Sequence, residues 1–257
     1  MLATARRELD KILGDFNPEA VEERKKMVSE SSTIRDALQS FRQNLKRFAG
    51  QEHYSIFQDV SDVLTPVEID TVLQLVQFEP INRTSAKQVV MYINKLIQNS
   101  YDAGFDQFTL NFQHFKDEGH YFEKLLQKIK AKPVRRLTVE LFGYCGNMLA
   151  GLCENITVAV HGDVLPYAFQ CSKNCSFYIQ GNVFDSLYSF ADESQGSTFY
   201  LGGKIERRAK AQRINGCIFK TPYPNTLETL LLGVDGNNRI ILVHPDGHEE
   251  IKRDFNG

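Results

Sequence analysis

Residues 176–205 read SFYIQGNVFDSLYSFADESQGSTFYLGGKI and contain one short motif twice. Phe-Tyr-Ile-Gln-Gly at 177–181 returns as Phe-Tyr-Leu-Gly-Gly at 199–203. A repeat of about 20 residues is typical of a solenoid, in which each unit is one coil that stacks on the next. Aligned on its glycine, the motif extends back to two earlier units, so that Gly143, Gly162, Gly181 and Gly203 share one position of the repeat.

Apolar and polar residues alternate before each glycine, as in Leu137-x-Val139-x-Leu141. A period of two predicts strands with one buried face. The motif keeps its direction from unit to unit, which favours a parallel β-solenoid over an antiparallel meander. An outward column suited to ladders between parallel strands holds Thr138, Thr157, Ser176 and Thr198, and a second inward column holds Leu149, Ala168, Leu187 and Ala209.

We expect the four aligned glycines to be structural. Glycine adopts backbone dihedral angles that other residues resist, so a glycine column marks a corner of the coil. A cradle for phosphate is the less favoured alternative. Each unit then ends at a turn residue, which is Asn155, Asn174 or Gly196.

Residues 1–134 read as mostly helical. Helix starts are predicted at Asn17-Pro18 and at Ser32, and the second helix stops near Gly50. Its apolar stripe packs on its own chain or, in the alternative we keep open, forms a homodimer seam between amino-terminal helices. The stripe consists of Ile34, Leu38, Phe41, Leu45 and Phe48.

Further elements follow before the repeats. Thr65-Pro66-Val67-Glu68 is a capping box that predicts a helix start. We also expect a helix over 85–101, a strand over 105–112 and a helix over 121–131.

At the carboxy-terminal end, the sequence predicts a β-hairpin cap. Strands at 230–234 and 239–243 flank a turn at 235–238, and a second turn at 245–248 precedes a strand at 249–254. The predicted fold class is α+β. We divide it into a helical domain at 1–134, a parallel β-solenoid at 135–224 and the cap at 225–257.

The composition and charge of the chain narrow the range of functions to be expected. With 30 basic and 32 acidic residues and a net charge of −2, the chain has no global basic field for nucleic acid. It shows no signal peptide and no apolar stretch of about 18 residues, so we expect no membrane association. Five cysteines in a chain of 257 residues indicate reduced thiols and a cytoplasmic location.

A family resemblance appears in the glycine units. The pattern V-x-G-[ND]-V occurs at 160–164 and, with isoleucine first, at 179–183. Over residues 137–221 it resembles the glycine-rich coils of the GXGXG domain, a right-handed parallel β-helix found in the large subunit of glutamate synthase and in formylmethanofuran dehydrogenase. There the domain is a spacer between catalytic parts. The resemblance therefore implies a scaffold or a component of a complex and assigns no catalytic residue.

Several residues could carry chemistry, but a structural role is favoured for each. Cys171 and Cys175 have a spacing that is not standard for zinc. His114 and His120 flank two acids in a predicted loop, and His161 faces outward beside Gly162. We therefore expect no metal and no cofactor, and the catalytic residues, if any, stay unknown.

Residues 204–213 form the one local concentration of charge, which we call the basic cluster. It could present a stripe to an acidic protein surface or to nucleic acid, or it could be a solvated coil edge, which we favour. It has no interleaved aromatic residues to stack bases, so nucleic acid is disfavoured. The possible binding residues are Lys204, Arg207, Arg208, Lys210 and Arg213.

Three functional hypotheses follow. The first is a non-catalytic scaffold or protein-interaction protein with a protein partner. The second is an accessory subunit or divergent member of an amidotransferase or formyl-transfer enzyme complex. The third is a weak nucleic-acid binder that uses the basic cluster. No P-loop, dinucleotide fingerprint or HExxH motif is present, so we favour a non-enzymatic role.

Overall fold

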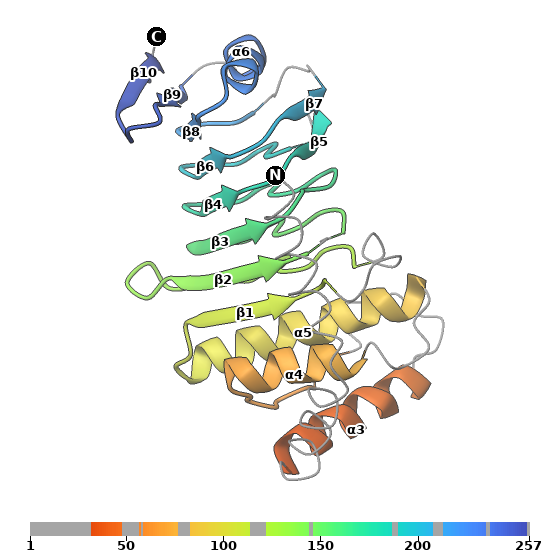
Figure 1. Ribbon diagram of the computed structural model, residues 1–257. Coiled ribbons are helices and arrows are strands. Elements are labelled where there is room, and N and C mark those ends of the chain that lie inside the picture. Colours follow the sequence, from red (N-terminus) through yellow and green to blue (C-terminus); the bar gives the residue numbers. More distant parts are fainter. Residues whose placement is uncertain are drawn as a thin grey trace.

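The computed structural model describes residues 32–47, 57, 59–76, 83–113, 122–143, 146–186, 190–207, 213–234 and 237–255. It confirms the α+β fold class. Helices gather at the amino-terminal end, and a parallel β-solenoid of about four turns stacks on them (Figure 1).

The strands of the solenoid form one long sheet and one short sheet. Each pair of neighbours in the long sheet is parallel, except β9 with β10. The short sheet pairs β5 (Val183–Ser186) with β7 (Ile205–Arg207) in parallel. The long sheet runs in the order β1 (Gln107–Asn111), β2 (Leu137–Phe142), β3 (Ile156–His161), β4 (Ser176–Ile179), β6 (Thr198–Leu201), β8 (Ile218–Thr221), β9 (Arg239–Val243) and β10 (Glu249–Arg253).

The register matches the repeat read from the sequence. The hydroxyl column is in register from β2 to β6, through the pairs Thr138↔Thr157, Thr157↔Ser176 and Ser176↔Thr198. Inside the coils, Phe199 stacks between Phe177 and Phe219 at ring centroid distances of 5.2 and 5.0 Å. A one-residue slip would turn this buried column outward, so the period of two fixes the register.

Each coil also has a segment that belongs to neither sheet, which we call the third side, and its backbone is unusual. Lys124, Leu126 and Lys128 have φ values of 69°, 58° and 63°, and the same alternation recurs in the next coils. The amides of Lys124 and Lys128 bond to the next coil instead of to their own turn: Lys124 N donates to Asn147 O at 2.8 Å, and Lys128 N donates to Gly151 O at 2.9 Å. The predicted helix over 121–131 is therefore wrong within the described residues, because this segment is a side of the first coil. The parallel sheet correspondingly starts at β1, before residue 135.

The second inward column follows this third side. Phe169 N donates to Leu149 O, and Ala191 N donates to Ala168 O. The buried column thus runs from Leu149 to Ala168 and on to Phe190. The coil from Ala168 to Phe190 is longer than the coil from Leu149 to Ala168, and its additional residues precede Phe190. Leu187 and Ala209, which the sequence placed in this column, lie outside the described residues.

Three helices lie within the described residues of the amino-terminal part. They are α3 (Ser32–Arg47), α4 (Pro66–Val76) and α5 (Arg83–Ala103). The capping box is confirmed, since Thr65 N donates to Glu68 Oε2 at 2.8 Å and Glu68 N donates to Thr65 Oγ1 at 3.3 Å. Ile34 and Phe41 on α3 are buried in the core of the chain itself. The predicted helix start at Asn17 and the residue Phe48 lie outside the described residues.

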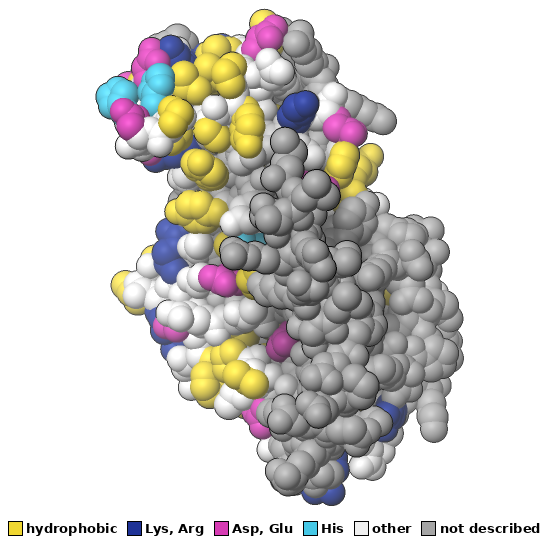
Figure 2. All heavy atoms as spheres, viewed as in Figure 1, with side chains coloured by type: hydrophobic (Ala, Val, Ile, Leu, Met, Phe, Trp, Pro, Cys, Tyr) yellow, Lys and Arg dark blue, Asp and Glu magenta, His cyan; other side chains and the backbone are white. Residues whose placement is uncertain are grey.

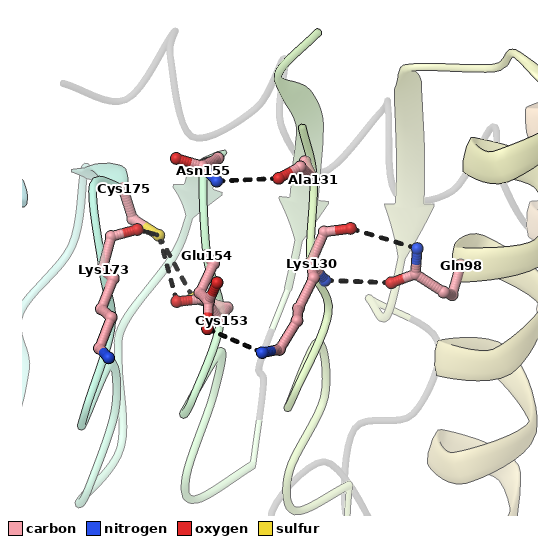
Figure 3. Close-up of polar contacts among 8 residues, drawn as sticks. All are labelled: Gln98, Lys130, Ala131, Cys153, Glu154, Asn155, Lys173 and Cys175. Carbon is pink, nitrogen blue, oxygen red and sulfur yellow. Dashed lines mark hydrogen bonds and ion pairs between the residues drawn. The ribbon is translucent and has the colours of Figure 1, made fainter. Parts of the chain in front are cut away.

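Helix α5 closes the open end of the first coil with side-chain amides (Figure 3). Gln98 Oε1 accepts from Lys130 N at 3.0 Å, and Gln98 Nε2 donates to Lys130 O at 3.2 Å. One turn earlier, Asn94 makes the same pair of bonds with Leu126 N and Lys124 O, at 2.7 and 3.0 Å. These amides take the place of a preceding coil, which satisfies backbone groups that an uncapped solenoid would leave unpaired.

The carboxy-terminal end differs in part from the predicted hairpin cap. Residues 224–233 form helix α6 (Pro224–Gly233), so the predicted strand at 230–234 is wrong. Pro224 at the start of the helix favours this outcome, and buried Leu230 anchors the helix to the core. The hairpin between β9 and β10 is confirmed, and Gly247, at φ 85°, lies in its turn.

The glycine column is set by the close approach of successive coils. Only Gly143 of the four has a positive φ, at 95°. A Cβ atom on Gly162 would lie 2.8 Å from Gly143 O, and Cβ atoms on Gly181 and Gly203 would lie still closer to the glycine carbonyl of the preceding coil. Space, more than backbone conformation, therefore requires glycine in three of the four coils.

We predict that Gly181→Ala lowers the free energy of unfolding by about 1–3 kcal/mol, because the added methyl group overlaps fixed backbone atoms. Gly151→Ala is the matched control, since the nearest atom to its Cβ would be 3.6 Å away. Urea unfolding followed by circular dichroism measures both. Equal effects from the two substitutions would contradict the stacked-glycine account.

We also predict that Asn94→Leu destabilises the protein by about 1–3 kcal/mol, because it leaves the buried Leu126 N–H without an acceptor. Lys95→Leu introduces the same side chain at the next position of α5 and serves as the control. Thermal unfolding compares the two variants. A loss no greater than that of the control would show that the amide cap contributes nothing.

Candidate functional site

A groove with a volume of about 610 Å³ runs along one corner of the solenoid, and we call it the corner groove. It crosses successive coils, and it is lined by basic and acidic side chains, by an apolar side chain and by a thiol. Its lining residues are Lys128, Lys130, Leu152, Glu154, Cys171, Lys173, Glu193, Gln195 and Arg213.

Two columns of side chains build the corner groove. The first column lies just before each turn residue and is held in register by parallel bridges, Lys130↔Glu154, Glu154↔Lys173 and Lys173↔Gln195. The second column lies two residues earlier, on the third side of the coils. It comprises Lys128, Leu152, Cys171, Glu193 and Arg213, each with a positive φ.

Lysines dominate the end of the corner groove nearest the helices. Lys130 Nζ lies 2.8 Å from Glu154 Oε1, and Figure 3 shows the Glu154 carboxylate between the ammonium groups of Lys130 and Lys173. The hydrogen bond from Lys130, together with the charges of Lys130 and Lys173, holds the pKa of Glu154 below its ordinary value. Two lysines thus flank one carboxylate, so Lys130, Glu154 and Lys173 together carry a net positive charge at this end of the corner groove.

Arg213 neutralises acidic side chains at the other end. It pairs with Asp192, at 2.6 Å, and with Glu193. Arg213 and Glu193 line the corner groove, whereas Asp192 is buried beside it. The described charges that line this end therefore balance, and the positive charge of the corner groove is concentrated at the end nearest the helices.

Three of the described thiols, those of Cys153, Cys171 and Cys217, are poor nucleophiles. Burial and the neighbouring Glu193 raise the pKa of Cys171, whose Sγ lies 3.3 Å from a Glu193 oxygen. Burial raises the pKa of Cys153, and it raises that of Cys217 to about 11. Because the thiolate is the reactive form, these side chains are mostly protonated and unreactive near neutral pH.

The buried thiols belong to a small-residue corner of the core. The Cys153 and Cys175 sulfur atoms are 3.5 Å apart, and Cys175 N donates to Ser197 Oγ at 3.2 Å. Ser172 Oγ donates to Ser194 Oγ at 2.9 Å in the same region. These contacts support the structural interpretation of Cys175.

The predicted basic cluster is divided between two sides of its coil. Lys204 is exposed and directly precedes β7, whereas Arg213 lies in the corner groove. Arg207 belongs to β7, but its side chain is not described, and Arg208 and Lys210 lie outside the described residues. A single stripe that includes both Lys204 and Arg213 would have to turn around the coil.

Of the remaining candidates, only His161 lies within the described residues. His161 stacks on Phe142 with ring centroids 4.2 Å apart, and its Nε2 lies 3.9 Å from Glu140. His114 and His120 lie outside the described residues. In the parts of the chain that the structure describes, no three His, Cys, Asp or Glu side chains lie close enough together to hold a metal ion.

Sequence reasoning missed the corner groove, although a signal for it exists. Asn155 and Asn174 mark the ends of two coils, and the residue before each of them, Glu154 and Lys173, belongs to the groove. Reading that preceding column would have found alternating charges.

Comparisons with protein-family models, with curated proteins and with solved structures gave no match to this chain. None of the helices within the described ranges is both long and apolar enough to cross a lipid bilayer.

We predict that Cys217 makes stability depend on alkaline pH. Its pKa rises from 9.0 to about 11 on folding, so the unfolded thiol ionises first and the free energy of unfolding falls between about pH 9 and 11. The loss reaches about 2–3 kcal/mol. Urea unfolding of the wild type and of Cys217→Ala under reducing conditions gives the difference at each pH. A difference that does not change over this range would contradict the prediction.

Proposed function

We propose that the protein is a non-catalytic scaffold that binds an acidic segment of a protein partner in the corner groove. The observation that carries the proposal is the lysine-rich end, where the charges of Lys130 and Lys173 both act on the single carboxylate of Glu154. Exposed lysines attract carboxylates, and the concentration of positive charge at one end of the groove would orient the bound segment.

The spacing of the coils suits an extended chain. Neighbouring parallel strands are about 4.8 Å apart, so Lys130 and Lys173, two strands apart, are separated by about 10 Å along the axis. About three residues of extended chain cover that length. We therefore infer a segment with acidic residues about three positions apart.

Binding is better supported than catalysis at this site. Cys171 is the thiol that lines the corner groove, and its raised pKa keeps it protonated. Lys128, Lys130 and Lys173 are exposed, which suits recognition by charge.

The resemblance to the GXGXG domain supports the scaffold proposal by analogy of shape. A parallel solenoid with stacked glycines fits a spacer between other proteins. On the same analogy, an accessory subunit of an amidotransferase or formyl-transfer complex is the form of scaffold that we would test next. A cytoplasmic location remains part of the proposal, and the free thiols of Cys153, Cys171, Cys175 and Cys217 are compatible with it.

We predict that a fluorescently labelled oligoglutamate peptide of about ten residues binds the wild type at low salt and that Lys130→Glu combined with Lys173→Glu weakens binding at least tenfold. Fluorescence anisotropy measures the affinity. Lys204→Glu is the control, because it makes a single charge change at an exposed lysine outside the groove.

The control also separates the groove from the basic cluster. A loss with Lys204→Glu as large as that with the groove variant would assign binding to the cluster. Binding unchanged by the groove variant would reject the corner groove as the site.

A further inference from the structure

The free edge of the long sheet is the outer side of β10. In the described part of the chain, β10 pairs only with β9, and the sheet order ends with it. The opposite edge, at β1, is covered by α4, where Asp70 accepts from Asn111 N at 3.0 Å and Gln74 donates to Asn111 O at 2.6 Å. Among the described residues, the edge at β1 is therefore covered by a helix, whereas the edge at β10 is not paired. An uncovered edge is a template for pairing with another strand.

The hairpin shows which backbone groups of β10 face outward. His244 N donates to His248 O, so these residues form a hydrogen-bonded pair. Such pairs alternate in an antiparallel ladder, which makes Leu242↔Glu250 the next bonded pair and Ile241↔Ile251 a non-bonded one. The N–H and C=O of Ile251 consequently point away from β9, toward the free edge.

The sequence of β10 is complementary to itself in charge. It reads Glu249-Glu250-Ile251-Lys252-Arg253, with acids before Ile251 and bases after it. In an antiparallel pair of two such strands centred on Ile251, Glu250 of one copy faces Lys252 of the other. Glu250 and Lys252 lie on the same face of the strand, since they form an ion pair with each other within one chain.

We propose that β10 is a self-association strand through which a second copy of this chain adds to the sheet, with a twofold axis at Ile251. Ile251 would exchange two backbone hydrogen bonds with its counterpart. On either side of this pair, an acidic residue of one copy would face a basic residue of the other. A twofold interface uses the same surface on both copies, and a self-complementary strand provides such a surface. This inference does not depend on the corner groove, which lies on another part of the coil.

The surroundings of Ile251 support the same occupant. Its side chain is 51% exposed, which is unusual for isoleucine in a strand. Figure 2 shows hydrophobic side chains gathered near this end of the molecule, with charges of both signs around the β9–β10 hairpin. An apolar centre with a charged rim is typical of an interface.

The bulge between Ile251 and Arg253 limits the length of the pairing. Only about three residues on each side can join, so the contact is small and belongs with weak, concentration-dependent interfaces. We therefore expect a dimer with a dissociation constant in the micromolar range.

Sedimentation velocity over about 5–500 µM tests the proposal with paired charge variants. Glu250→Lys and Lys252→Glu each place like charges across the twofold axis, so each variant alone should dimerise about tenfold more weakly than the wild type. A mixture of the two variants restores opposite charges across the interface, although each chain still carries its own substitution. The mixture should form heterodimers at least as readily as the wild type forms dimers.

A second variant tests the backbone pairing. Ile251→Pro removes an N–H that points to the free edge and leaves the bonds to β9 in place, so it should remain folded by circular dichroism and be monomeric. A wild type that is monomeric at every concentration would overturn the proposal. A dimer that persists in folded Ile251→Pro, or single charge variants that do not associate on mixing, would overturn it as well.

Discussion

The in-register hydrogen bonding between successive coils is the interaction on which the rest of this structure depends. It holds the strands about 4.8 Å apart, which leaves no room for a Cβ atom where Gly162, Gly181 and Gly203 stack. It also turns every repeated position into a column, so that phenylalanine fills the interior while hydroxyls and charges line the outside. Finally, it leaves backbone groups at both ends of the solenoid without a further coil to bond to. Side chains of α5 bond to these groups at one end, and the β9–β10 hairpin ends the sheet at the other.

Much of the fold could be predicted, because the period of two within each strand and the longer repeat of the coils both report the same buried columns. Strand direction, register and the capping box of α4 follow from local patterns. The segment 122–131 was predicted wrongly because its apolar residues, Leu125, Leu126 and Ile129, are spaced as in a helix. Its backbone is instead fixed by bonds to Asn147 and Gly151, which no local pattern records.

The site was less predictable than the fold. Lys130, Glu154 and Lys173 each lie about one repeat from the next in the sequence, and only stacking brings them into one groove. The charges of the basic cluster are close in sequence, yet Lys204 directly precedes β7 whereas Arg213 lies in the corner groove. In a solenoid, residues one repeat apart are better neighbours than residues a few positions apart, and a search for sites should follow the repeat.

Amide hydrogen exchange along the third side of the coils tests the central claim most directly, because the corner groove exists only if this side is held by bonds between coils. The account predicts that the amides of Lys128, Leu152 and Cys171, which donate to the next coil, exchange as slowly as those of β3 and β4. Exchange at the rate of an unstructured peptide at these three amides would contradict the account.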